Sequence, residues 1–119
     1  MKKIFIKINN IIWQVFIDKD LSSDLLGLTS DNEYTIRLSQ TLTKQAFKPT
    51  TIHELVHAFL YSYGFKLKKE FTDEDVCEFI SMNIEQILEK YKKIENELLK
   101  EQSENEIHKN KWRNIWSIR

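Results

Sequence analysis

Two of the three histidines in this 119-residue chain stand four positions apart, with a glutamate directly after the first. They are His53 and His57, the glutamate is Glu54, and together they form the HExxH pattern. Four residues make about one helical turn, so both imidazoles would project from one face and could bind a single metal ion. Chance would produce this pattern in roughly half a per cent of chains of this composition. We therefore interpret the pair as metal ligands rather than as ordinary surface histidines.

The pair lies in a segment whose apolar residues recur at helical spacing. Pro49 suits the first turn of a helix, and Gly64 suits its C-terminal stop. The apolar positions between them are Ile52, Leu55, Val56, Phe59 and Leu60. The sequence therefore predicts a helix from about Pro49 to Gly64, with the HExxH pattern well inside it.

A third metal ligand is expected from the following helix. Catalytic zinc is typically held by two histidines and one carboxylate, with a fourth position left open. Thr72 and Asp75 form a capping box that predicts where this helix begins, and three acids at its start are candidates: Glu74, Asp75 and Glu78. For Asp75, stabilisation of the helix dipole is the better interpretation. Glu78 lies about 170° from the centre of the apolar face and Glu74 about 130°, which disfavours Glu78 slightly and leaves both open.

The rest of the chain predicts a small sheet and one long helix. Alternating residues on both sides of Asn9-Asn10 predict a hairpin over 2–8 and 11–18, which pairs Ile8 with Ile11, Ile6 with Trp13 and Ile4 with Val15. Residues 19–32 are polar and suggest a loop, and residues 34–39 alternate as a third strand. A helix from 73 to about 100 would be roughly 42 Å long, so in a globule about 35 Å across it must kink, break or protrude. The expected fold class is α+β, with an antiparallel sheet packed on two helices.

Composition limits the partners and the compartment. Eighteen basic residues balance eighteen acidic ones, which argues against a nucleic-acid partner, and no apolar run is long enough to span a membrane. Cys77 is the only cysteine, so the chain cannot form an internal disulfide and a cytoplasmic location is expected. Residues 101–119 are predicted to form a helical aromatic and basic tail, with Trp112 and Trp116 one helical turn apart. We expect these tryptophans to fold back onto the domain, and residues 84–119 are the candidate surface for a partner or for self-association.

The segments TIHELVHAFL and EDVCEFI resemble the small gluzincin metallopeptidases, particularly the phage and ImmA/IrrE-like group. The resemblance covers roughly residues 34–90 and implies that residues 1–119 are one minimal zincin-like domain with one Zn²⁺ per chain. It implies that Glu74 is the third ligand and that Glu78 contacts the ligands without binding the metal itself. Glu78 is also the alternative to Glu74 as third ligand. The chain departs from the family pattern at Glu78, where a shorter acid or an amide is usual.

The resemblance implies hydrolysis of peptide bonds in a peptide or protein substrate. Zinc would activate a bound water, and Glu54 would take its proton as general base. The 34–39 strand would align an extended substrate as the edge strand does in zincins. Tyr61 and Tyr63 are better explained by packing, so no oxyanion stabiliser is assigned. The alternative is a catalytically silent zinc-binding protein that keeps the metal helix as an interaction or regulatory module.

Overall fold

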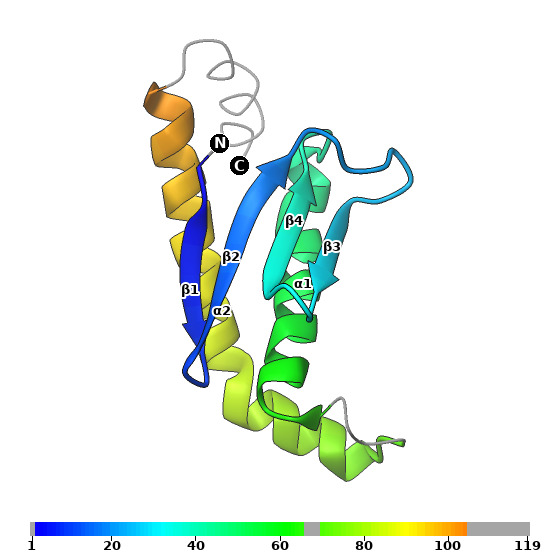
Figure 1. The fold of residues 1–119 in the computed structure, drawn as a ribbon. Coiled ribbons are helices and arrows are strands. Elements are labelled where there is room, and N and C mark those ends of the chain that lie inside the picture. The colour runs from blue at the N-terminus through cyan, green and yellow to red at the C-terminus, as the bar shows by residue number, and fades with distance from the viewer. Residues whose placement is uncertain (1, 66–69, 105–119) are drawn as a thin grey trace.

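The computed structural model describes residues 2–65 and 70–104, and it confirms the α+β fold class. The predicted packing of Trp112 and Trp116 onto the domain falls outside the described residues. The elements are β1 (Ile4–Ile8), β2 (Ile11–Asp18), β3 (Gly27–Ser30), β4 (Thr35–Ser39), α1 (Lys44–Ser62) and α2 (Asp73–Glu104). The four strands form one sheet in the order β1-β2-β4-β3. Both helices cover the same face of this sheet, with α1 behind β4 and β3 and α2 behind β1 (Figure 1). The result is a two-layer domain in which apolar side chains of the sheet and the helices form one core.

The N-terminal hairpin has the predicted turn and register. Asn9 and Asn10 both have positive φ angles, 49° and 67°, as a two-residue turn between twisted strands requires. The pairs are Ile4 with Val15, Ile6 with Trp13 and Ile8 with Ile11. These side chains alternate with exposed ones, so the hairpin turns one apolar face toward the helices.

The sheet is mixed, whereas the sequence predicted an antiparallel one. Strand β2 pairs with β4 in parallel, and the chain between them supplies β3, which pairs antiparallel with β4. The predicted edge strand 34–39 is therefore an inner strand, and β3 takes the edge. The prediction of a loop over 19–32 missed β3 because this strand has only four residues, Gly-Leu-Thr-Ser, and begins with a glycine, which is rare in strands. Its pairing with β4 holds it in place.

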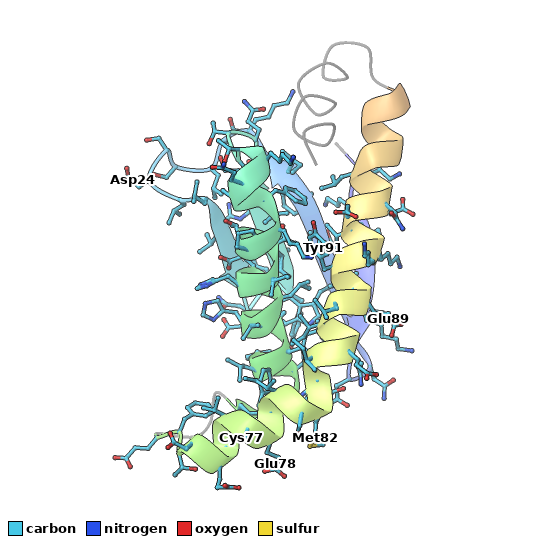
Figure 2. The ribbon with its side chains drawn as sticks, turned by 180° about the vertical axis from the view of Figure 1, so that it is seen from behind. Asp24, Cys77, Glu78, Met82, Glu89 and Tyr91 are labelled. Carbon is cyan, nitrogen blue, oxygen red and sulfur yellow. The ribbon has the colours of Figure 1, made fainter. Side chains whose placement is uncertain are left out.

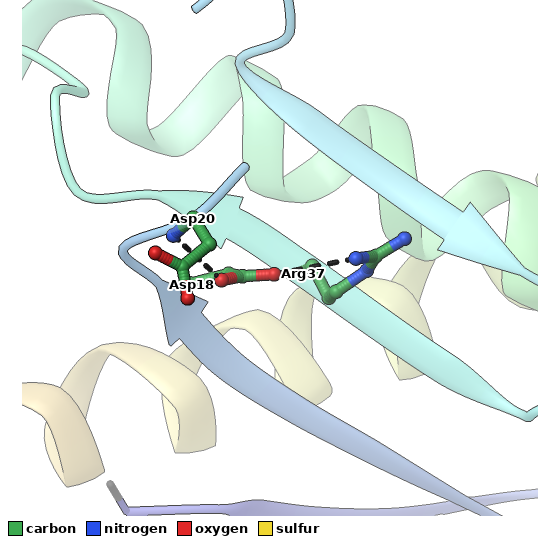
Figure 3. Close-up of polar contacts among 3 residues, drawn as sticks. All are labelled: Asp18, Asp20 and Arg37. Carbon is green, nitrogen blue, oxygen red and sulfur yellow. Dashed lines mark hydrogen bonds and ion pairs between the residues drawn. The ribbon is translucent and has the colours of Figure 1, made fainter. Parts of the chain in front are cut away.

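An ion pair links the two parallel strands. Arg37 Nη1 on β4 lies 3.3 Å from Asp18 Oδ2 at the end of β2, and the other carboxylate oxygen of Asp18 accepts the backbone N–H of Asp20 (Figure 3). The Asp18 side chain is only 13% exposed, so solvent screens this pair less than an open surface pair. The contact fixes the point at which the chain leaves β2.

Helix α1 begins five residues before Pro49, which corrects the predicted start. Thr43 is the N-cap, and its side chain accepts the backbone N–H of Ala46. The extra turn buries Phe47 in the core, and this burial offsets the hydrogen bond that Pro49 cannot donate inside the helix. The predicted end is confirmed, because Gly64 follows the helix with a φ angle of 79°.

Helix α2 begins with the predicted capping box. The Thr72 hydroxyl accepts the N–H of Asp75, and the Asp75 carboxylate accepts the N–H of Thr72. The helix has 32 residues, about 48 Å if straight, and it changes direction part-way along (Figure 1). Its second part packs on the sheet, and its first part passes the C-terminal end of α1. In the described part of the chain, no helix has the length and apolarity to cross a bilayer.

Candidate metal centre

The two histidines of the HExxH pattern face each other on one side of α1. Their Nε2 atoms are 3.2 Å apart, and their ring planes are inclined at 73°. Two nitrogens bound at 2.0–2.1 Å to one tetrahedral zinc ion are about 3.3–3.4 Å apart. The same distance also suits a hydrogen bond between the two rings when one nitrogen carries a proton. Both side chains are exposed, so an ion can approach them from solvent.

Glu54 points from the same helix toward the edge strand. Its side chain is buried, with 7% exposed, and Oε1 accepts a 2.7 Å hydrogen bond from the Thr29 hydroxyl on β3. The same hydroxyl lies 3.2 Å from the Glu54 carbonyl oxygen. Strand β3 thus fixes the carboxylate of the acid that lies beside the histidine pair.

Gly27 provides the space that Glu54 occupies. A Cβ atom built on Gly27 would lie 2.9 Å from Cγ and 3.1 Å from Oε2 of Glu54. The first distance is one that real Cβ atoms essentially never show and the second is tighter than nine in ten real contacts, so any larger residue at 27 would displace the Glu54 side chain. Glycine is needed here for close approach between strand and helix.

A pocket of about 320 Å³ brings these groups together. Its walls are β3 with the residue after it, Asp31, and the face of α1 that carries His53, Glu54 and His57. Asp31 is the one acid besides Glu54 in the described lining of this pocket. Gly27, Thr29 and Asp31 are not among the site residues predicted from sequence, because all three lie in the segment predicted as a loop. Only the pairing of β3 with β4 shows their role.

Tyr61 extends the histidine face by one further turn and also lines this pocket. Its ring packs against Trp13 and Tyr34, with centroids 6.1 and 5.9 Å away. The hydrogen bond and charge interaction with Tyr34 raise the pKa of the Tyr61 phenol, and burial and the nearby Asp31 carboxylate raise it further. The phenol is therefore kept protonated, and its hydrogen bond is made with Tyr34. The predicted packing role is observed, but Tyr61 also faces the pocket.

Two hydrogen bonds attach the end of α1 to the hairpin. The Trp13 indole donates from Nε1 to the Ser62 hydroxyl at 2.9 Å, in a buried position. Asn9 donates from Nδ2 to the Ser62 carbonyl oxygen, also at 2.9 Å. These bonds join residues about fifty positions apart and set the position of α1 along its axis relative to the sheet.

The acids chosen from sequence on α2 lie elsewhere. Glu74, Cys77 and Glu78 are exposed, and none of them lines the pocket beside the histidines. Cys77 and Glu78 lie on the part of α2 that extends past the end of α1 (Figure 2). Over residues 2–65 and 70–104, no three His, Cys, Asp or Glu side chains are arranged so that they could hold a metal ion together. The structure thus pairs His53 with His57 and leaves the third ligand unassigned.

Comparisons with known proteins do not assign the chain to a family. No family model matches it, no curated protein is detectably similar, and no solved structure matches its fold.

Proposed function

We propose that the protein is a zinc-dependent metallopeptidase in which His53 and His57 bind the metal and Glu54 is the general base. The observation that supports this most strongly is the 3.2 Å separation of the two Nε2 atoms next to an oriented, buried carboxylate. Bound zinc would supply an activated water and a polarised substrate carbonyl. The resemblance of the HExxH helix to the small gluzincins supports the same activity.

In this proposal Glu54 moves the proton. Thr29 holds Oε1, so Oε2 is the atom that accepts a proton from the attacking water and passes it to the leaving amine. The phenol of Tyr61 lines the same pocket, but its hydrogen bond is made with Tyr34, so no donor is assigned to the oxygen of the tetrahedral intermediate. Because Gly27 has no side chain, it leaves room for the Glu54 carboxylate.

The substrate would bind along β3. This strand pairs with β4 on one side and is the edge of the four-stranded sheet on the other. An edge strand offers backbone N–H and C=O groups to an extended chain, which would then run past His53 and His57. The proposed substrate is therefore an extended peptide, and β3 replaces the 34–39 strand in the role first given to that segment.

Three residues are candidates for the third metal ligand. Glu74 is the ligand that the family resemblance implies, Glu78 is its alternative, and Asp31 is the acid that already lines the pocket. Zinc content after Glu74→Ala, Glu78→Ala and Asp31→Asn would identify the ligand, because only its loss lowers the metal-to-protein ratio and the zinc affinity.

The second candidate function is a catalytically silent zinc-binding protein, in which the histidine pair binds the metal without turnover. Within residues 2–65 and 70–104 no third side chain is arranged with the two histidines to hold a metal ion, although Asp31 and Glu54 line the same pocket. Glu54→Gln separates the two functions. In a peptidase the variant binds one zinc per chain and no longer cleaves a mixture of unstructured peptides, measured by mass spectrometry. If the wild-type protein binds zinc but cleaves none of these peptides, the silent zinc-binding function holds. A wild-type protein that binds no zinc excludes both.

A further inference from the structure

An apolar groove lies between α1 and the first part of α2, away from the histidines. We call it the α1–α2 groove. It has a volume of about 390 Å³, and its walls include Val56 and Leu60 on α1 and Val76, Ile80 and Ile84 on α2. The three α2 side chains are 46%, 50% and 40% exposed. So many half-exposed aliphatic residues on one face indicate a surface that another segment covers.

The groove continues a helix face that is otherwise buried. Further along α2, Ile87, Tyr91, Ile94 and Leu98 lie in the core. The sheet covers this second part of the helix, while the first part extends past the end of α1 without a strand above it (Figure 1). The apolar face of α2 is therefore continuous, but in the described part of the chain Val76, Ile80 and Ile84 are left half-exposed although Phe79 between them is buried.

The segment 107–119 has the side chains that suit this groove. Trp112, Ile115 and Trp116 are spaced i, i+3 and i+4, which would place them on one face of a helix. Amphipathic helices commonly bind apolar grooves through anchors with this spacing. Tryptophan is also the residue that contributes most to such contacts.

Charge favours the same pairing. Residues 70–78, which include the groove residues Phe71 and Val76, contain five acids and no Lys or Arg. Segment 107–119 contains four Lys or Arg and no acid. When the three lysines at 66, 68 and 69 are counted with the acidic stretch, its net charge is still −2. The groove end and the segment therefore attract each other over a range set by the ionic strength.

The reach of the chain favours a second copy as the donor of the segment. Helix α2 runs about 30 Å from Ile84 to Glu104, and the eight residues that lead to Trp112 span about 26–29 Å when fully extended. Within one chain, Trp112 would reach only the near end of the groove, and only without helical structure in between. If two copies pack with their α2 helices antiparallel, the end of each helix lies beside the groove of the other.

We propose that segment 107–119 of one copy binds the α1–α2 groove of a second copy, and that the exchange is reciprocal and forms a two-fold dimer. This proposal does not depend on metal binding or on proteolysis. It uses a face of α2 that the proposed active site does not use.

The first test is the mass of the full chain in solution, measured by light scattering after size-exclusion chromatography. We expect a dimer for the wild type, and monomers for Ile80→Asp and for the double variant Trp112→Ser/Trp116→Ser. Met82→Asp is the matched control, because Met82 is more exposed, at 67%, and does not line the groove (Figure 2). It should remain a dimer. A monomeric wild type, or a tryptophan double variant that stays dimeric, would overturn the proposal.

The second test distinguishes exchange between copies from packing of groove on groove. The tryptophan double variant has an intact groove and a defective segment 107–119, whereas the Ile80→Asp chain has a defective groove and an intact segment. The intact segment of the second chain can therefore bind the intact groove of the first. A fluorophore on Cys77, the only cysteine, reports binding through anisotropy. Adding Ile80→Asp chain to labelled double variant should give a saturable rise that weakens at least tenfold when salt is raised from 50 to 500 mM. The triple variant Ile80→Asp/Trp112→Ser/Trp116→Ser, added in place of the Ile80→Asp chain, should give no rise. Absence of a saturable rise in the first titration overturns the proposal.

Discussion

The Thr29 hydroxyl donates a 2.7 Å hydrogen bond to Oε1 of Glu54 and so connects the edge strand to the acid of the HExxH pattern. A hydrogen bond to a carboxylate contributes about 1.5–3 kcal/mol. It also decides which oxygen of Glu54 remains available for proton transfer. The geometry of the proposed base therefore depends on a residue 25 positions earlier in the chain.

Replacing Thr29 with Val removes this donor and keeps the side-chain shape. We expect the peptidase kcat to fall by at least tenfold, because the Glu54 carboxylate loses its fixed orientation. The free energy of unfolding should fall by about 1–2 kcal/mol. Thr29→Ser keeps the hydroxyl and should recover most of the kcat. Equal loss in the Ser and Val variants would show that the methyl group, and not the hydrogen bond, matters.

Gly27→Ala tests the close approach of β3 to Glu54. The added Cβ would lie 2.9 Å from Glu54 Cγ, so we expect a loss of about 1–3 kcal/mol in urea unfolding. In a Glu54→Ala background the same substitution should cost much less, because the colliding atom is gone. Gly64→Ala is a useful contrast. Apart from its two chain neighbours, no atom of the described residues lies within 4 Å of its built Cβ, and its cost of about 1 kcal/mol would come from the positive φ angle.

Zinc should stabilise the folded protein through the histidine pair. At free zinc of about 100 times Kd, the free energy of unfolding rises by about 2.7 kcal/mol, which corresponds to roughly 10 °C in Tm. A chelator should abolish the shift, and so should His53→Ala or His57→Ala. The third histidine supplies the control, since His108→Ala lies outside the pair and should keep the full shift. An equal zinc shift in the His53→Ala variant would contradict the proposed site.

The raised pKa of Tyr61 predicts that the contribution of this residue to the free energy of unfolding falls at alkaline pH. Its pKa is raised in the folded state above the ordinary value of 10.0, chiefly by the hydrogen bond with Tyr34. A raised pKa means that the contribution is complete below the pKa of the unfolded chain and is lost as the pH rises through the folded value. The unfolding free energy of wild type minus that of Tyr61→Phe should thus decline above about pH 10. A difference that stays constant across this range would show that Tyr61 titrates normally.

The parts of the structure that depend on local sequence could be predicted. The Asn9-Asn10 turn, the register of the hairpin, the capping box at Thr72 and the stop at Gly64 each follow from a few adjacent residues. The histidine pair belongs to this class, because a spacing of four within a helix fixes its geometry.

The parts that depend on distant residues could not. Strand β3 forms because β4 is there to pair with it, and its own residues indicate a loop. Gly27, Thr29 and Asp31 therefore gave no signal as neighbours of Glu54. Helix α1 likewise begins before Pro49 because the extra turn buries Phe47 in the core. The preference of proline for the first turn of a helix gives no information about this burial.

The same division between local and distant contacts sets an order of assembly for the site. The two imidazoles come together as soon as α1 forms, because they belong to a single turn. The partners of Glu54 arrive only after β3 has paired with β4 and α1 has packed against β3, a step that closes the chain between Thr29 and Glu54 and costs loop entropy. A newly made chain could therefore bind zinc before its proposed catalytic glutamate is in position, so metal loading alone would be a poor measure of completed folding.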